Sequence, residues 1–170
     1  MENETRSMTQ DDCIKFLSNH CIGHLAYIAG KSPFIVPVTY YYDKENKCLI
    51  SYSGEGHKVE SMRRYSEVAL QVEEVTAIHN WRSVMVNGTF EELKGATAKK
   101  YLHTFANGVQ DFLKRVEGAK VDYIKDFSSK MESETAPVVY CIHISDIIGK
   151  YRVTDEEVDV IPLHGADTFG

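Results

Sequence analysis

The chain has 170 residues, of which 43% are hydrophobic and 26% are charged, an ordinary composition for a soluble globular protein. Its formal net charge is −6, from 19 basic and 25 acidic residues, and the acidic residues are spread along the whole sequence. Nucleic acids and anionic membranes favour a concentrated basic face, so we expect neither as the main partner.

The length favours a single domain over residues 1–170, with loose tails at 1–8 and 163–170. No apolar run approaches the roughly 18 residues of a membrane-spanning helix, and the first residues are polar and acidic, unlike a secretory signal. The four cysteines are scattered without a CxxC pair, which favours free thiols in a reducing compartment. We therefore expect a cytoplasmic protein without a metal site.

The N-terminal third predicts one helix followed by strands. Thr9 and Asp12 are spaced like a capping box, and apolar residues then recur at helical spacing, which predicts a helix over about 10–20. Alternating and β-branched stretches separated by turn-like sequences follow at 24–29, 34–42 and 48–53. We interpret the whole segment 24–53 as a β-meander.

The rest of the chain alternates between helices and strands. Helical spacing recurs at 57–66, at 98–116, with Gly108 as a candidate break, and at 121–131. Strands are expected at 67–75, at 82–93, with a turn or bulge at Asn87-Gly88, and at 136–153. Short connections favour antiparallel pairing, so the sequence predicts a mainly β fold: a six-stranded antiparallel β-barrel with peripheral helices.

The stretch SYSGEGHK (51–58) joins a predicted strand to a predicted helix. Gly54 and Gly56 allow the backbone to approach a ligand closely. The helix start behind them presents free N–H groups and a positive dipole end, and Lys58 adds a cation. This combination suits a phosphate group. The alternative is a glycine turn followed by a solvated lysine.

A second stretch, HNWRSVMVNG (79–88), places the only tryptophan, Trp81, two residues before Ser83. A hydroxyl at a strand start can donate to a phosphate, and Arg82 can contact an anion through two hydrogen bonds. Neighbouring strand residues face opposite sides, so we expect one of Arg82 and Ser83 to be merely exposed. Trp81 alternatively caps the open end of the barrel.

A third stretch, FIVPVTYYY (34–42), contains a proline inside a strand-like run. Pro37 removes one ladder N–H, which indicates an edge strand or a bulge. Irregular backbone beside it can turn its remaining polar groups toward a flat ligand. An ordinary edge strand is the alternative.

In this order the stretches resemble the pyridoxamine 5′-phosphate oxidase-like FMN-binding split-barrel family, most closely its branch of 5-nitroimidazole resistance proteins. The motifs of that branch read G-x-L-A, P-x-x-V-P-V-x-[YF], G-x-K and W-x-S-V-x-V-x-G. They match residues 23–26, 33–40, 56–58 and 81–88 of this sequence. No single motif is specific, but all occur in order within about residues 10–150.

The resemblance implies a six-stranded split barrel that forms a homodimer, with FMN at the subunit interface. The residues implied to contact FMN are Pro37, Val38, Thr39, Tyr52, Ser53, Gly56, His57, Lys58, Trp81, Ser83 and Val84. Among them, Lys58, Ser83 and the loop from Ser53 would hold the phosphate. The backbone at 37–39 would line the isoalloxazine ring, and Tyr52, Trp81 and Val84 would pack around the ribityl chain or the ring edge.

The resemblance also implies chemistry that the cofactor supplies. A flavin takes a hydride or electrons from a reduced partner, such as NAD(P)H, and passes them to a small acceptor, such as a nitroaromatic, a nitroimidazole or a quinone. Many relatives in the nitroimidazole branch carry a histidine near the end of the third strand, where this chain has Ser51, Tyr52 and Ser53. Any activity that depends on that histidine is therefore left open.

Residues that would bind a pyridoxamine phosphate substrate are not evident, so vitamin B6 oxidation is not the expected activity. No side chain is nominated as an acid or base. The resemblance therefore implies an FMN-dependent oxidoreductase. The alternatives are a non-catalytic flavin carrier or sensor, and a split barrel that binds haem or a deazaflavin.

Overall fold

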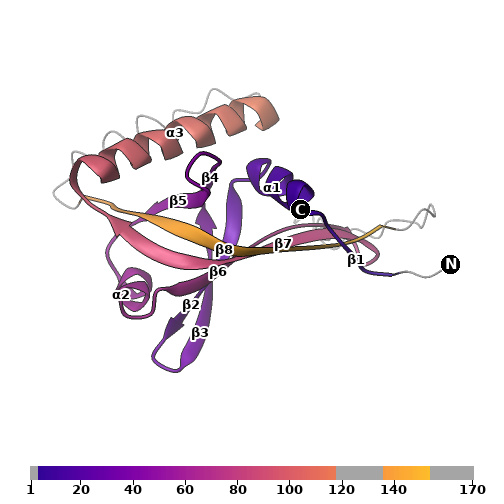
Figure 1. The fold of residues 1–170 in the computed structure, drawn as a ribbon, viewed down its shortest axis with the longest axis horizontal. Helices are drawn as coiled ribbons and strands as arrows, with labels where there is room; N and C mark the ends of the chain where they lie inside the picture. The colour runs from indigo at the N-terminus through magenta and orange to yellow at the C-terminus, as the bar shows by residue number, and fades with distance from the viewer. Residues whose placement is uncertain (1–3, 118–135, 154–170) are drawn as a thin grey trace, which may run out of the picture.

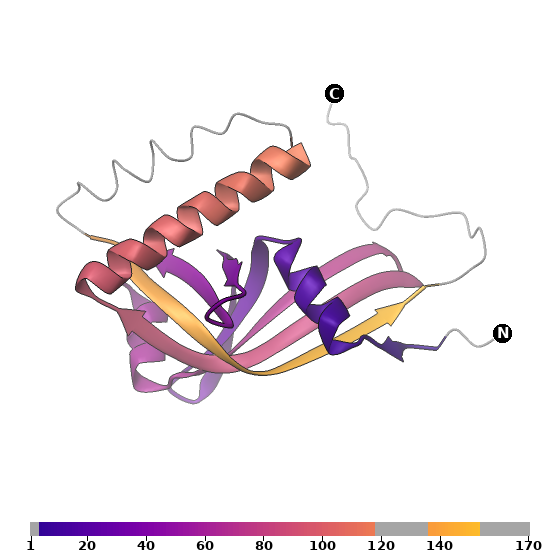
Figure 2. The same cartoon turned by 45° about the horizontal axis from the view of Figure 1, so that its top comes forward.

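The computed structural model describes residues 4–117 and 136–153, which form a curled antiparallel sheet with three helices (Figures 1 and 2). The elements in chain order are β1 (Arg6–Ser7), α1 (Gln10–Ser18), β2 (Ile22–Ala29), β3 (Ser32–Thr39), β4 (Tyr41–Asp43), β5 (Cys48–Ser53), α2 (His57–Arg64), β6 (Glu67–Ala77), β7 (Asn80–Leu93), α3 (Gly95–Glu117) and β8 (Val138–Arg152). The predicted helix at 121–131 and the predicted tail at 163–170 lie outside the described residues. No helix among the described residues is long and apolar enough to cross a membrane.

The eight strands follow the order β3-β2-β6-β7-β8-β5-β4, and β1 pairs with β8. Every pairing is antiparallel, which confirms the predicted mainly β fold, although the strand number is eight rather than six. The additional strands are the short β1 and β4. Residues 6–7 are therefore paired with β8, although 1–8 was expected to be a loose tail.

The predicted meander over 24–53 is wrong, because the run 34–42 is divided between β3 and β4. Tyr40 lies at the corner between them and is fully buried. Its hydroxyl donates to the Leu17 carbonyl (2.8 Å), and its backbone N–H donates to the Cys21 carbonyl (2.8 Å). These bonds turn the chain, so β3 and β4 stand at opposite ends of the strand order and the sheet curls into a split barrel.

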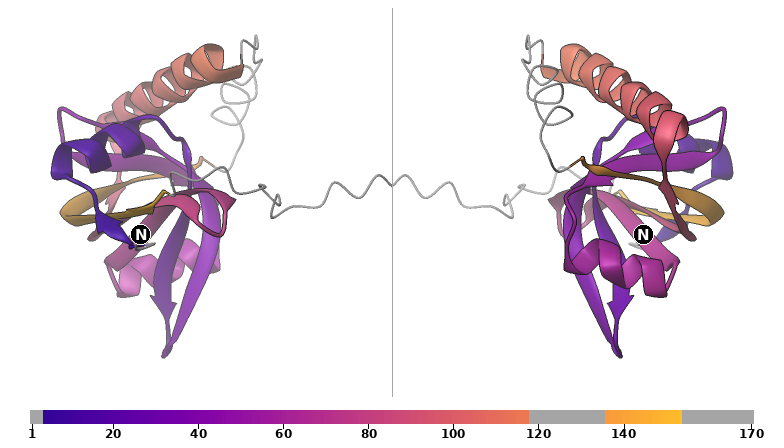
Figure 3. Two further views of the ribbon diagram at one scale, coloured as in Figure 1. Left: turned by 90° about the vertical axis from the view of Figure 1, so that its right-hand side faces the viewer. Right: turned by 90° about the vertical axis from the view of Figure 1, so that its left-hand side faces the viewer.

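The main core lies inside the curl. Leu25, Leu70 and Val84 from three strands are fully buried there. Helix α1 adds apolar side chains at one end of this core, and Val59 and Met62 add those of α2. A second apolar cluster joins α3 to β5 and β8, on the other side of the barrel from α2 (Figure 3).

Three local predictions have clear outcomes. Thr9 caps α1, since its side-chain oxygen accepts from the Asp12 N–H (3.2 Å), as predicted. The register shifts between Asn87 and Gly88, which confirms a bulge. The expected break of α3 at Gly108 is wrong: the helix is continuous, and a Cβ at Gly108 would overlap the Tyr41 ring. The glycine makes room for Tyr41.

Candidate functional site

The segment 53–56, the glycine loop, leads into α2, whose N-terminus has no side-chain cap. Gly56, at the N-cap of α2, has φ 156° and supplies no side-chain hydrogen bond to the first turn. Lys58 follows in this turn and is half-buried, and burial lowers the pKa of its ammonium group. Among residues 4–117 and 136–153, no ion pair to Lys58 is formed. The loop therefore presents a desolvated cation beside free backbone N–H groups, an arrangement that attracts an anion.

The start of α2 rests against the hairpin of β2 and β3. The His57 ring lies 5.1 Å from the Phe34 ring, edge to face, and its Nδ1 is 3.3 Å from the Tyr27 hydroxyl. Tyr27 and Phe34 stack on each other at 5.7 Å. These aromatic contacts fix the glycine loop beside β3, the edge strand that the sequence predicted at Pro37.

Arg63, further along α2, forms ion pairs with two carboxylates. It binds Glu55 through two nitrogens (2.8 Å each) and Glu92 at 2.6 and 2.9 Å. Hydrogen bonds from Arg63 lower the pKa of both carboxyl groups. Arg63 therefore fixes the loop to the end of β7 and is not available for a phosphate.

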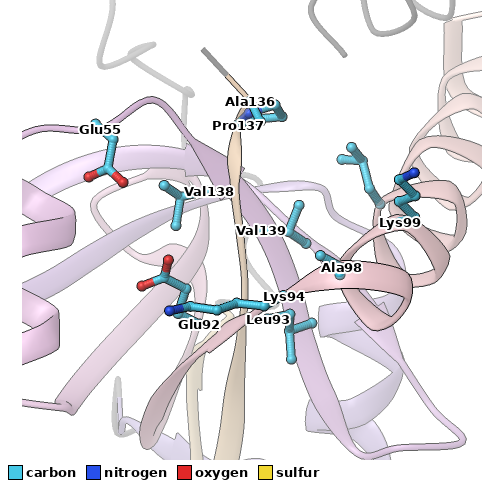
Figure 4. Close-up of a pocket in the computed structure, with 12 residues that line it drawn as sticks. Glu55, Glu92, Leu93, Lys94, Ala98, Lys99, Ala136, Pro137, Val138 and Val139 are labelled. Carbon is cyan, nitrogen blue, oxygen red and sulfur yellow. The ribbon is translucent and has the colours of Figure 1, made fainter. Parts of the chain in front are cut away.

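A cavity of about 410 Å³ lies beyond this ion pair network (Figure 4). Glu55 and Glu92 stand on one side of it and the start of α3, with Ala98, on the other, while Val138 and Val139 lie between them. Lys94 contributes to the lowered pKa of Glu92 through its charge. The acidic residues at this cavity are thus already matched by Arg63 and Lys94.

Pro37 on β3 and Trp81 and Ser83 on β7 share the face of the sheet that points away from the core. Pro37 is paired in register with His24, His24 with Gln71, and Gln71 with Met85. The Gln71 amide donates to the Ser83 hydroxyl oxygen (3.0 Å) on the same face. Arg82 is exposed and Ser83 half-buried, so these neighbours differ as expected.

Other predicted residues point elsewhere. The side chains of Val38 and Val84 are buried in the core, at 8% and 0% exposure, so only their backbone atoms can line a ligand. Tyr52 packs on Phe105 of α3, with ring centroids 5.4 Å apart, and Ser53 is half-buried opposite Val138. The residues predicted to bind the flavin therefore lie in different environments and do not form one cluster.

Lys58 and the β3 edge are close enough to be spanned by one nucleotide. His57 contacts Phe34, which lies three residues before Pro37, or roughly 10 Å along an extended strand. Ser83 is separated from this edge by three strand spacings, roughly 14 Å. Along β7, Ser83 is nine residues from Glu92, which binds Arg63 of α2. The register partner of Ser83 on β8 is Lys150, which pairs with β1. Ser83 and Lys58 therefore do not converge within one chain.

Three residues near these surfaces were missed by sequence reasoning. Gln71 lies within the strand run EVALQVEEV, where alternation places it on the outer face. Arg152 stands opposite Trp81 on β8, and its Nε is buried without a hydrogen-bond partner among the described residues. Ser51 is buried, at 3% exposure, and donates to the Thr39 carbonyl (2.8 Å). Only the position of Gln71 had a local signal.

The first residue of the run Ser51-Tyr52-Ser53 is enclosed in this chain. Ser51 is paired with Tyr140, a fully buried residue on β8. The Ser51 hydroxyl is occupied by the Thr39 carbonyl and faces the barrel corner. Ser51 thus holds the end of β3 in place and does not present a reactive group to solvent.

The fold and the glycine loop define a split-barrel protein with a candidate anion site at the start of α2. A family model described as pyridoxamine 5′-phosphate oxidase matches residues 9–151, so the chain belongs to this family. This confirms the resemblance drawn from the motifs.

Individual relatives are distant. An uncharacterized protein of Rhizobium meliloti is 23% identical over 151 residues, covering 89% of this chain and 97% of that protein. The crystal structure of an FAD-binding protein from Mesorhizobium loti is 26% identical, with a TM-score of 0.67 and coverage of 89% and 98% of the two chains. A putative 5-nitroimidazole antibiotic resistance protein from Bacteroides thetaiotaomicron, 15% identical, matches with a TM-score of 0.63 over 87% of each chain and shows the fold alone.

Proposed function

We propose that this protein binds FMN along the β3 edge, with the phosphate at Gly56–Lys58 and the isoalloxazine ring against the backbone of residues 37–39. The observation that carries the proposal is Lys58, a half-buried cation at an uncapped helix start, for which no carboxylate partner is described. A phosphate would offset the desolvation of the ammonium group and accept hydrogen bonds from the free N–H groups of α2. The FAD-binding relative from Mesorhizobium loti, similar over 89% of this chain, supports a flavin.

A homodimer would complete this site. Ser83 and its strand neighbour Trp81 do not converge with Lys58 in one chain, so the second chain would supply them. The outer face that carries Ser83 is rich in exposed apolar side chains: Ile22 (61%), Ile35 (68%), Met85 (37%) and Ile148 (43%). An apolar area of this kind marks a protein interface more often than a free surface. A symmetric dimer through this face would bring both groups of residues together.

The chemistry proposed is electron or hydride transfer from a reduced donor such as NAD(P)H to a small acceptor such as a nitroaromatic. The bound flavin supplies this redox chemistry. The protein's part is to hold the phosphate at Lys58, to fix the β3 backbone through Ser51 and to exclude water from the ring. The free thiols at Cys13 and Cys141 suit a reducing compartment, so the proposed setting is the cytoplasm.

A non-catalytic flavin carrier or sensor is the second candidate. Ser51 favours it, because its hydroxyl is buried and donates to the Thr39 carbonyl, so it offers no reactive group to a substrate. Such a module would bind FMN with similar contacts but would not turn over with a nitro acceptor.

The absorbance spectrum of the purified protein, with FMN titration by fluorescence, tests the proposal. We expect a yellow protein or saturable binding of added FMN. Bleaching by NAD(P)H with reoxidation by a nitroaromatic would support the oxidoreductase, and binding without turnover the carrier. A protein that takes up haem or a deazaflavin but not FMN would refute both.

A further inference from the structure

Two cysteines far apart in sequence meet beneath α3. Cys48 begins β5 and Cys141 lies on the neighbouring strand β8, where Cys48 is paired with His143 and Ile50 with Cys141. The cysteines are therefore diagonal neighbours across the ladder. Both are fully buried, and their sulfurs are 3.6 Å apart. A disulfide requires about 2.05 Å between the sulfurs, and diagonal neighbours in a sheet have Cα atoms roughly 7–8 Å apart, at the limit that a disulfide spans, so the bond forms only if the two strands also shift.

The two thiols act on each other electrostatically. The hydrogen bond with Cys141 lowers the pKa of Cys48. The pKa of Cys141 is raised, first by the same hydrogen bond and then by burial. Asp43 and Glu91 add negative charge near both sulfurs and oppose a second ionisation. Loss of one proton therefore favours a Cys48 thiolate that accepts the S–H of Cys141.

We propose that Cys48 and Cys141 form an oxidisable dithiol site that closes to a disulfide with hydrogen peroxide or another small hydroperoxide. The Cys48 thiolate attacks a peroxide oxygen, the O–O bond breaks, and Cys48 becomes a sulfenic acid as the first water or alcohol leaves. Cys141 then attacks the Cys48 sulfur, the S–O bond breaks, and water leaves with the thiol proton. Overall, two thiols lose two electrons and two protons, and the peroxide gains them.

Access to the pair depends on α3. Leu102, Phe105 and Val109 of this helix cover the cluster that contains both cysteines. Helix α3 lies across the outside of β5 and β8 (Figures 1 and 2). A small oxidant therefore reaches the sulfurs when this helix moves away, so the packing of α3 sets the rate of oxidation. The resulting bond would join β8 to β5, whose last residue, Ser53, lies three residues before Gly56.

The test is oxidation of the full chain by hydrogen peroxide, followed by alkylation under denaturing conditions and mass spectrometry. Of the four free cysteines, two should become resistant to alkylation. The chain should lose about 2 Da, the mass of two hydrogen atoms. Peptide mapping should join the β5 and β8 peptides. Cys48→Ser and Cys141→Ser should each abolish the mass loss, whereas Cys13→Ser, at another buried thiol, should not.

Two results would overturn the proposal. One is a wild-type chain that keeps all of its alkylatable thiols. The other is a disulfide that involves Cys13 or Cys21. Leu102→Ala should speed disulfide formation in the wild-type background, and an unchanged rate would overturn the role of α3. The mapped cross-link of the wild-type chain decides the matter even if a cysteine variant fails to fold.

Discussion

At the scale of single residues, Lys58 is the side chain whose environment most needs a partner. A half-buried ammonium group loses hydration without gaining an opposite charge from the described chain, which is why its pKa is lowered. The neighbouring cation Arg63 shows the opposite situation, because two carboxylates surround it. Arg63 is paired with carboxylates and Lys58 is not, so we propose that the anion of Lys58 comes from a ligand.

Substitution of Lys58 by alanine should weaken FMN binding by about 1.5–3 kcal/mol, the usual range for a hydrogen bond to a charged group. Fluorescence titration with FMN and with riboflavin gives the readout. Riboflavin, which lacks the phosphate, should bind equally to wild type and variant. Lys44→Ala, an exposed lysine in the turn after β4, is the matched control. Equal FMN affinity in Lys58→Ala would place the phosphate elsewhere.

The lowered pKa of Lys58 also gives a pH dependence. Lysine is charged below its pKa, so phosphate binding is strong at neutral pH and weakens as pH rises through that pKa, which lies below the ordinary 10.5. The phosphate itself is already a dianion above about pH 7. The ratio of FMN to riboflavin affinity should therefore fall as the pH rises from neutral through the lowered pKa of Lys58, at a pH below 10.5. In Lys58→Arg the ratio should stay constant, because guanidinium remains charged. A wild-type ratio that is flat over this range would contradict the assignment.

The same residue affects the stability of the ligand-free protein with the opposite sign. The folded pKa is below the unfolded value, so the unfolded chain binds more protons between the two values. The free energy of unfolding should therefore rise as pH increases through this window.

At the scale of elements, helices and long strands were predictable from periodicity, whereas the corners were not. The division of 34–42 at Tyr40 depends on hydrogen bonds to Leu17 and Cys21, which are distant in sequence. The continuity of α3 through Gly108 depends on the Tyr41 ring. Both features arise from packing between elements, which local spacing does not record.

Gly108→Ala tests this packing directly. Alanine normally stabilises a helix interior by about 1 kcal/mol relative to glycine. Here a Cβ would overlap the Tyr41 ring, so we expect a net destabilisation of about 1–3 kcal/mol, typical of overpacking. Chemical denaturation measures it, and Asn107→Ala, exposed on the same helix, should not be destabilising. A stabilised Gly108→Ala would show that Tyr41 moves aside at little cost.

Ser51→Ala tests the corner at the end of β3. The variant loses the partly buried hydrogen bond to the Thr39 carbonyl, so unfolding should become easier by about 1–3 kcal/mol. Ser145→Ala removes a comparable bond, to the Asn87 carbonyl, at an exposed site and should cost less. If both variants lose the same stability, the burial of the Ser51 bond contributes nothing.

At the scale of the whole molecule, the ordered motifs were enough to predict the family and the split barrel. They were not enough to place the predicted ligand contacts. Val84 and Ser83 are adjacent in sequence, yet one points into the core and the other onto the outer face. Because a motif records order along a strand and not distance across a sheet, it could not show that Ser83 and Lys58 lie apart within one chain.

This separation makes the oligomeric state decisive. If the outer face joins two chains, a charge placed on it should dissociate them and weaken FMN binding together. Met85→Glu puts a carboxylate at the centre of this face, beside Gln71 and Ile148 in the register. Sedimentation should show a dimer for wild type and a monomer for Met85→Glu. Val116→Glu, an exposed apolar position on α3, should remain dimeric.

The two readouts separate the possible arrangements. A monomeric Met85→Glu that binds FMN as tightly as wild type would mean that one chain holds the whole ligand, and that Ser83 has no part in binding. A dimeric Met85→Glu would mean that the chains meet through another surface. Joint loss of dimer and FMN affinity, with Val116→Glu unaffected, is the outcome expected for a site built from the Lys58 loop of one chain and the Ser83 face of its partner.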